Sequence, residues 1–224
     1  MGLSDLLVEG IKVVGFDLDG TLYPYTEEIQ RRNREEIYGE LSRILGIHFE
    51  DVDKTFNGLY NDRSEECCGS GSRTIERIGR IYGKELNGVG IVQECLTRAN
   101  VWDLIEENFG LVKMLNDLSK KYCLDLITST HSSLMHPKLE RIGINIGVFN
   151  YVFTGENGSK SNGSIFKEWL KLRDFNVNEY LYVGDNEKID VDVPKRLGIK
   201  TCFIGDYEEA DYCVDNIVML RFIL

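Results

Sequence analysis

Short apolar runs recur along the chain and predict buried strands. They occupy residues 11–16, 122–128, 150–154, 180–184 and 200–204, with a weaker run at 211–214. Between the later runs, apolar positions recur at helical spacing over 110–121, 132–142, 163–173 and 188–197. Strands that alternate with helices are typical of parallel sheets with crossover helices. The pattern therefore predicts an α/β fold with a doubly wound, Rossmann-like parallel sheet.

One long segment breaks this alternation. Residues 25–108 contain no convincing strand, and helical patterns cover 27–45, 73–82 and 89–99. A segment of this length is too long for a simple crossover, so it should fold as a small module of its own. We therefore expect an α/β core domain of residues 1–24 and 109–224. We expect the inserted helical domain, residues 25–108, to lie above the strand ends as a lid.

The first apolar run ends in two carboxylates, Asp17 and Asp19, which are followed by Gly20. Parallel α/β sheets bind their ligands at this end of the strands. The predicted strand ends at these two aspartates, so the regular alternation of side chains stops there. We therefore expect the turn to set the direction of the Asp19 side chain. Gly20 lets the chain turn there. An ordinary polar turn after a strand is the alternative explanation.

Three later predicted strands also end in polar residues. Thr128 and Ser129 end the second run, Lys160 follows the third, and Asp185 ends the fourth, with Asp190 five residues further on. Each residue alone has a plain structural explanation: Thr128 as a strand former, Lys160 as a surface lysine and Asp190 as a solvated helix residue. Because all of them follow carboxyl ends of strands, together they predict one site.

These residues, in this order, resemble the motifs of haloacid dehalogenase superfamily hydrolases of the phosphatase branch. The segment from Asp17 to Thr21 resembles the first motif, Thr128 the second, Lys160 the third, and Asp185 with Asp190 the fourth. The resemblance covers about residues 8–24 and 109–215. The helical insertion matches the cap domain of the family in position and type. Tyr23-Pro24 after the first motif is further similar to the pyrimidine-nucleotidase-like branch.

The resemblance implies roles for the two aspartates of the first motif. Asp17 would be the nucleophile that forms an aspartyl-phosphate, and Asp19 the general acid and base. Mg²⁺ would be the cofactor, held by Asp17, Asp185 and the backbone carbonyl oxygen of Asp19. The dehalogenase branch lacks the second aspartate, so Asp19 disfavours dehalogenation.

The remaining motif residues would serve the phosphoryl group. Thr128 would donate its hydroxyl to a phosphoryl oxygen, and Lys160 would supply positive charge. Asp190 would pair with Lys160 and hold it in place, and metal ligation is its alternative role. The sequence departs from the family at Ser129, where asparagine is usual, and where serine and glycine replace the prolines that usually follow the third-motif lysine.

Residues that would contact the rest of the substrate are less defined. Candidates are Tyr23, Tyr25, Arg73, Ser129 and His131. Arg73 follows a small, polar segment that is also typical of a surface loop. His131 lies near an expected helix start, where a solvated histidine is an equally ordinary interpretation.

Composition narrows the partners. The chain has 26 basic and 37 acidic residues and a formal net charge of −11, which argues against binding of a nucleic-acid polymer. The six cysteines form no CxxC pair, and the role of the adjacent Cys67-Cys68 is left open. No apolar run is long enough for a membrane span, and no secretory signal is evident. We therefore expect a cytoplasmic protein without a membrane partner, of undetermined oligomeric state.

The combined hypothesis is a Mg²⁺-dependent phosphatase that hydrolyses small phosphomonoesters: a nucleotide, phosphoglycolate or a sugar phosphate. One alternative is a phosphomutase of the β-phosphoglucomutase kind, which would return the phosphoryl group to a bound sugar. Another is a non-catalytic phospho-acceptor or binding protein. Signalling receiver domains are of that class, but they are about half this length and lack the insertion.

Overall fold

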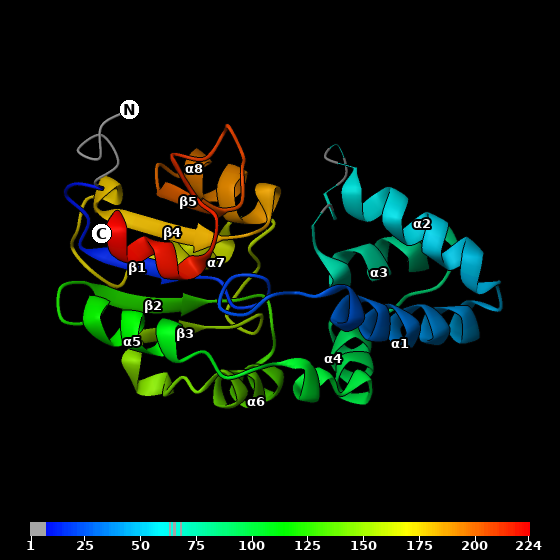
Figure 1. The fold of residues 1–224 in the computed structure, drawn as a ribbon. Helices are drawn as coiled ribbons and strands as arrows, with labels where there is room; N and C mark the ends of the chain where they lie inside the picture. The colour runs from blue at the N-terminus through cyan, green and yellow to red at the C-terminus, as the bar shows by residue number, and fades with distance from the viewer. Residues whose placement is uncertain (1–7, 63, 65, 68) are drawn as a thin grey trace. The chain divides into compact units, whose positions relative to one another are not determined.

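The computed structural model describes residues 8–224 apart from residues 63, 65 and 68. Residue contacts divide the described chain into two compact units (Figure 1). The first comprises the described residues up to Pro24 together with Ile105–Leu224, and the second is Tyr25–Leu104. The inserted unit thus ends before residue 108. Residues 105–108 belong to the first unit because Ile105 is buried and the N–H of Asn108 donates to the carbonyl of Ile142 at 3.0 Å.

The first unit contains a six-stranded parallel sheet with strand order β3-β2-β1-β4-β5-β6. Its strands are β1 (Val13–Phe16), β2 (Cys123–Ile127), β3 (Tyr151–Phe153), β4 (Tyr180–Gly184), β5 (Lys200–Ile204) and β6 (Tyr212–Val214). The chain begins in the centre of the sheet, extends to one edge, and then returns to extend to the other. This order confirms the predicted doubly wound α/β fold, and each predicted run contains one strand.

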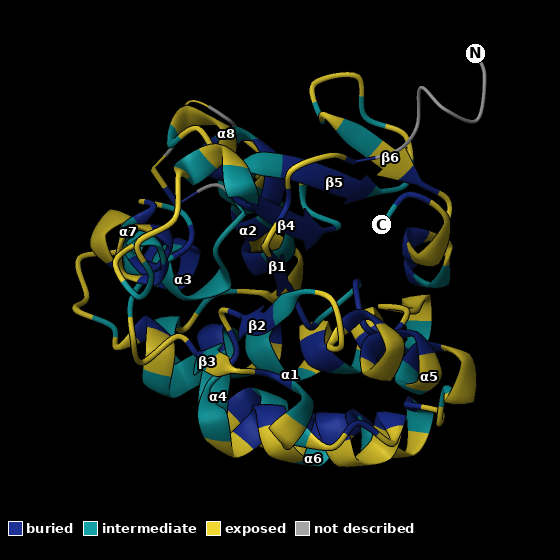
Figure 2. Cartoon of the chain, turned by 90° about the vertical axis from the view of Figure 1, so that its left-hand side faces the viewer, coloured by how far each residue is buried: buried dark blue, intermediate teal, exposed yellow. Residues whose placement is uncertain are grey.

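Helices cover both faces of this sheet (Figures 1 and 2). They are α5 (Phe109–Leu118), α6 (Ser132–Ile142), α7 (Ser164–Leu170) and α8 (Val193–Arg196), with short helices at Ile146–Val148, Val177–Glu179 and Ile217–Phe222. The predicted helix at 188–197 is divided into a π-helical turn, Glu187–Asp192, and α8. Such turns are frequent at functional sites, and this one carries Asp190.

The core of the first unit lies between the sheet and α7. Trp169 and Phe166 of α7 pack against Tyr180 and Tyr182 of β4 with edge-on ring contacts. β1 is buried along its whole length, as the dark blue centre of Figure 2 shows. A strand buried on both faces is what the continuous apolar run predicts. The core therefore fixes the central strands, which carry the candidate site at their ends.

The second unit is helical throughout its described part. It contains α1 (Glu27–Leu45), α2 (Phe49–Asn61), α3 (Gly71–Ile81), α4 (Gly88–Ala99) and the short helix Val101–Leu104. Its core is formed by Tyr38, Leu41, Val52, Phe56, Ile75 and Ile78. Helix α2 was not among the helical patterns named from the sequence; of its 13 residues, Val52 and Phe56 are buried.

Of the adjacent cysteines, Cys67 lies in the second unit, and Cys68 is outside the described residues. Cys67 is buried, and its Sγ lies 3.8 Å from the carbonyl oxygen of Leu59. The five described cysteines are all free thiols. Among the described helices, none combines the length and the apolar character that crossing a membrane requires.

Candidate active site

The end of β1 places Asp17 and Asp19 at the carboxyl edge of the sheet. The N–H of Asp17 still donates to the carbonyl of Val183 in β4, at 2.9 Å, so Asp17 continues the sheet pairing. The chain then turns, and the N–H of Leu22 donates to the carbonyl of Leu18 at 3.0 Å. The side chain of Asp17 is 8% exposed, whereas that of Asp19 is 27% exposed. The two carboxylates of the motif therefore occupy different environments.

Gly20 permits this turn for two reasons. Its φ of +86° is in the left-handed region, which side-chain-bearing residues rarely adopt. In addition, a Cβ atom at Gly20 would lie only 2.0 Å from Oδ2 of Asp185. The turn thus brings the backbone after Asp19 directly against the carboxylate at the end of β4.

A buried lysine lies among the carboxylates. Nζ of Lys160 donates to Oδ1 of Asp17 and, at 2.9 Å, to Oδ1 of Asp190. The side chains of Lys160 and Asp190 are each 1% exposed. Nζ of Lys160 also lies 5.3 Å from the ring centre of Tyr182. The structure thus brings together the predicted residues of three motifs, and Asp190 forms the pair with Lys160 that the sequence predicts.

Electrostatics in this cluster are dominated by burial. Burial raises the pKa of Asp17 well above its ordinary value, although the positive charge of Lys160 opposes the rise. Burial, reinforced by the negative charge of Asp190, raises the pKa of Asp185 to about 7. Burial by itself would lower the pKa of Lys160, but the charges of Asp17 and Asp190 outweigh it and raise that pKa. With Asp17, Asp185 and Asp190 all ionised, the cluster would hold three carboxylates against the single positive charge of Lys160.

The described residues fit a hard divalent cation. Asp17, Asp185 and Asp190 each offer a carboxylate oxygen, and these oxygens all lie within 4.8 Å of one another. Mg²⁺ prefers such oxygen donors and keeps several water ligands. Asp190 already accepts from Lys160 and, at 3.0 Å, from the N–H of Asn186. Asp185 has no ion pair in the described part of the chain. The donor chemistry and the excess negative charge therefore both suit Mg²⁺.

Thr128 directly follows β2, and its N–H donates to the carbonyl of Phe153 at 2.9 Å. It is fully buried, and its Oγ1 accepts a hydrogen bond of 3.0 Å from the N–H of Thr130. A hydroxyl that accepts through its oxygen can still donate its own hydrogen. Ser129 is exposed. Its backbone carbonyl oxygen lies close to Gly155: a Cβ atom added at Gly155 would be only 2.5 Å from this oxygen.

Asp19 is held by donors from three segments. Its Oδ1 accepts from the hydroxyl of Tyr23 and from Nζ of Lys138, and its Oδ2 accepts from the hydroxyl of Thr130. Burial would raise the pKa of Asp19, but the charge of Lys138 and these hydrogen bonds outweigh it and lower that pKa. Among these donors, only Tyr23 was a candidate from the sequence.

Lys138 and Thr130 were missed, and so was Thr21, whose hydroxyl lies 3.5 Å from Asp17 and 3.4 Å from Asp185. A signal for Lys138 was present in the sequence. It stands four residues after Leu134 and four before Ile142, on the apolar stripe of the predicted helix 132–142. A lysine at such a position is buried only when it has a partner.

The remaining candidates have other described contacts. His131 is the N-cap residue of α6; its Nδ1 accepts from the N–H of Ser133 at 3.3 Å, and its Nε2 lies 3.0 Å from Glu156. Arg73 lies in the first turn of α3, and Tyr25 accepts from the side chain of Asn33 at 2.6 Å. Their roles toward a substrate stay predictions.

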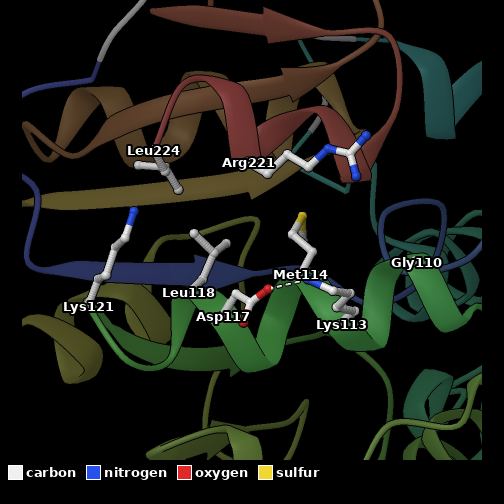
Figure 3. A pocket seen from close by; sticks show the side chains of 8 residues that line it. All are labelled: Gly110, Lys113, Met114, Asp117, Leu118, Lys121, Arg221 and Leu224. Atoms are coloured by element: carbon white, nitrogen blue, oxygen red, sulfur yellow. Dashed lines mark hydrogen bonds and ion pairs between the residues drawn. The ribbon is translucent and has the colours of Figure 1, made fainter.

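A separate hollow lies elsewhere on the first unit (Figure 3). It has a volume of about 270 Å³, and α5, the residue Lys121 and the last residues of the chain line it. Lys113 and Asp117 pair at its rim, at 2.8 Å. None of the site residues described above lines it, so it is distinct from the carboxylate cluster.

Comparison with known proteins places this arrangement in context. The family model described as "Haloacid dehalogenase-like hydrolase" matches residues 14–204. A glyceraldehyde 3-phosphate phosphatase of Methanocaldococcus jannaschii is 25% identical over 92% of this chain and 94% of its own length. The crystal structure of a HAD phosphatase from Thermococcus onnurineus has a TM-score of 0.64 at 24% identity, covering 94% of this chain and 96% of that chain. A HAD-hydrolase of Bacillus subtilis bound to magnesium has a TM-score of 0.61 at 17% identity, covering 96% and 98%.

Proposed function

This chain belongs to the haloacid dehalogenase-like hydrolases and is a phosphoric monoester hydrolase; on this basis we propose that it hydrolyses small phosphomonoesters in a Mg²⁺-dependent reaction with Asp17 as nucleophile. The observation that carries the proposal is the buried cluster of Asp17, Lys160 and Asp190 at the carboxyl ends of the central strands. Asp185 completes the oxygen donors, as the end of β4 brings it next to Gly20.

In the first step, a carboxylate oxygen of Asp17 attacks the phosphorus atom. The bond between phosphorus and the leaving oxygen breaks, and an aspartyl-phosphate forms on Asp17. Asp19 gives a proton to the departing alkoxide, and it must bind that proton for this step against the charge of Lys138 and the hydrogen bonds, which lower its pKa. The side chain of Asp19 is more exposed than that of Asp17, so it is the more accessible of the two carboxyl groups for proton exchange.

In the second step, a water molecule attacks the phosphorus of the aspartyl-phosphate. Asp19, now a carboxylate, takes a proton from this water, so phosphate leaves and free Asp17 is regenerated. Lys160 orients Asp17 through its hydrogen bond and balances part of the negative charge. Thr128 would donate its hydroxyl hydrogen to a phosphoryl oxygen, since its own oxygen accepts from the N–H of Thr130.

Mg²⁺ would be held by Asp17, Asp185 and the backbone carbonyl of Asp19. When bound, the cation would offset the negative charge of the carboxylates and the phosphoryl oxygens. The donor set and the raised pKa values of Asp17 and Asp185 support this assignment. A fold neighbour bound to magnesium agrees with it. Arg73, on the second unit, stays a candidate for substrate contact.

We propose triose phosphates as the first substrates to test, because the curated relative is named for glyceraldehyde 3-phosphate. Nucleotides, phosphoglycolate and sugar phosphates complete the panel. The assay measures inorganic phosphate released with Mg²⁺ and with a chelator. We expect release only with Mg²⁺ and its loss in Asp17→Asn. Asp117→Asn is the matched control, because Asp117 is an exposed carboxylate of α5. Isomerisation of a sugar phosphate without phosphate release would instead indicate a phosphomutase.

A further inference from the structure

We propose that Lys138 is a positioning residue that holds the carboxylate of Asp19 in its working orientation. The inference rests on the proposed function, in which Asp19 transfers the protons. Its direct observation is the hydrogen bond from Nζ of Lys138 to Oδ1 of Asp19. Lys138 therefore acts on the reaction through Asp19, not through the phosphoryl group.

The burial of Lys138 requires a partner, and Asp19 is that partner. The side chain of Lys138 is 5% exposed. Removing a charged ammonium group from water is costly unless a charged or hydrogen-bonding partner compensates. The ion pair with Asp19 is the one within 4.0 Å that the described part of the chain provides for Lys138. The ion pair thus holds the ammonium group of Lys138 next to Asp19, in the turn that follows β1.

Helix α6 gives Lys138 a fixed base. Leu134, Met135, Leu139 and Ile142 are all buried on the same face of this helix. The start of the helix is also fixed, because the N–H of Ser132 donates to Oε2 of Glu156 at 2.9 Å. A side chain that emerges from such a packed face has few positions available. Lys138 can therefore restrain Asp19 more firmly than a lysine on a surface loop could.

Thr130 and Tyr23 complete the restraint. Thr130 donates to Oδ2 of Asp19, so both carboxylate oxygens of Asp19 have a donor. Tyr23 donates to the same oxygen as Lys138, and Nζ of Lys138 lies 5.9 Å from the centre of the Tyr23 ring. Donors on both oxygens oppose rotation of the carboxylate about its last bond, so the orientation of Asp19 is set.

The two buried lysines of the site bind different carboxylates. Lys160 donates to Asp17 and Asp190, whereas Lys138 donates to Asp19. Loss of Lys160 would affect the nucleophile and the phosphoryl charge. Loss of Lys138 would affect proton transfer, which matters most when the leaving group is a poor one. This difference separates a positioning role from a general electrostatic one.

The test compares Lys138→Met with the parent enzyme on two substrates under Mg²⁺. One is an alkyl phosphate that the parent hydrolyses, whose leaving alkoxide needs a proton. The other is p-nitrophenyl phosphate, whose leaving group does not. We expect the rate of the first step, measured as alcohol released in a single turnover, to fall about 100-fold for the alkyl phosphate, with a much smaller fall in the single-turnover release of p-nitrophenolate and little change in KM. Lys138→Arg should restore part of the loss, because it keeps a charged donor.

The same substitution in the Asp19→Asn background makes the test decisive. If Lys138 acts through Asp19, Lys138→Met should lower kcat no further there. A further fall of similar size in that background, or an equal fall in the first-step rate for both substrates, would overturn the inference. Lys167→Met, at an exposed position of α7, is the matched control for loss of a lysine. Thermal unfolding of each variant identifies any that fails to fold, and the Arg variant then carries the comparison.

Failure of the proposed function would look different. If Asp19→Asn alone left the turnover of the alkyl phosphate unchanged, the role of Asp19 itself would be wrong. If Asp19→Asn abolished turnover while Lys138→Met matched the parent, only the inference about Lys138 would fail.

Discussion

Lys138 and Asp19 are joined by a hydrogen bond although 119 residues separate them in the chain. The contact joins the loop after β1 to the second turn of α6. It places a buried charge next to the carboxylate that the first motif provides for proton transfer. The surroundings of Asp19 thus depend on a helix that no motif of the family resemblance included.

The neutral donors to Asp19 should matter less than Lys138. Hydrogen bonds from a charged donor are about twice as strong as those from neutral hydroxyls. We expect Thr130→Val and Tyr23→Phe each to lower kcat for an alkyl phosphate by about 3- to 10-fold. Steady-state kinetics with equal amounts of folded protein measure this. A fall as large as that of Lys138→Met would contradict the ranking.

Gly20→Ala should impair catalysis through Asp185. The new Cβ would lie 2.0 Å from Oδ2 of Asp185, and the backbone has a φ of +86°. The Asp185 carboxylate must then move, and we expect a fall in kcat of about 100-fold and a loss of about 1–2 kcal/mol in unfolding free energy.

Gly46→Ala separates these two effects. Gly46 also has a positive φ, +72°, but no atom lies within 4 Å of its would-be Cβ. We expect a similar loss of stability with unchanged kcat. Equal kinetic effects of the two substitutions would show that backbone strain, not displacement of Asp185, explains the Gly20 result.

The metal-free protein should lose stability as pH rises from about 4 to about 7. Burial and the charge of Asp190 raise the pKa of Asp185 from its ordinary value of 3.8 to about 7. In this window the unfolded chain releases a proton that the folded chain keeps, so a higher pH favours unfolding. We expect a decrease on the order of 2 kcal/mol, because the neighbouring carboxylates share the titration.

Asp185→Asn and Mg²⁺ should each counter this loss. The substitution removes the titrating group, so the stability of the variant should change less over the same pH range. Mg²⁺ favours the charged carboxylates, so it should raise the Tm of the parent more at pH 8 than at pH 5. Thermal unfolding with and without Mg²⁺ measures both. An equal Mg²⁺ effect at the two pH values, or an unaltered effect in Asp185→Asn, would contradict the assignment.

A buried ion pair in the first unit should contribute to stability and not to turnover. Asp125 of β2 is fully buried and accepts two hydrogen bonds from Arg173, at 2.7 and 2.9 Å, and one from Trp169, at 2.7 Å. Asp125→Ala leaves the Arg173 charge without this partner, so we expect a loss of about 3–5 kcal/mol.

Denaturant unfolding measures this loss, and Asp117→Ala is its control. Asp117 pairs with Lys113 and Lys120 on the exposed face of α5, where such pairs contribute at most about 1 kcal/mol. The kcat of folded Asp125→Ala should match that of the parent. A loss below about 1 kcal/mol would contradict the structural role of this pair.

The sheet and most of the motif geometry follow from the sequence because they depend on local patterns. Apolar runs fix the strands, and parallel strands bring their carboxyl ends to one edge, so Asp17, Lys160 and Asp190 could be placed together. Lys138 and Thr130 could not be assigned to Asp19, since that contact depends on how α6 packs. Helix α2 was not named among the helical patterns, although its buried Val52 and Phe56 pack into the core of the second unit.

The nucleophilic role of Asp17 is tested most directly by isolating its phosphorylated form. Asp19→Asn should slow the attack of water while still accepting a phosphoryl group from p-nitrophenyl phosphate, whose leaving group needs no proton. The variant is mixed with this substrate and Mg²⁺, quenched in acid, digested and analysed by mass spectrometry. We predict one added phosphoryl group on Asp17. Phosphate release without such an adduct in the parent and the variant, or an adduct on another residue, would contradict this account.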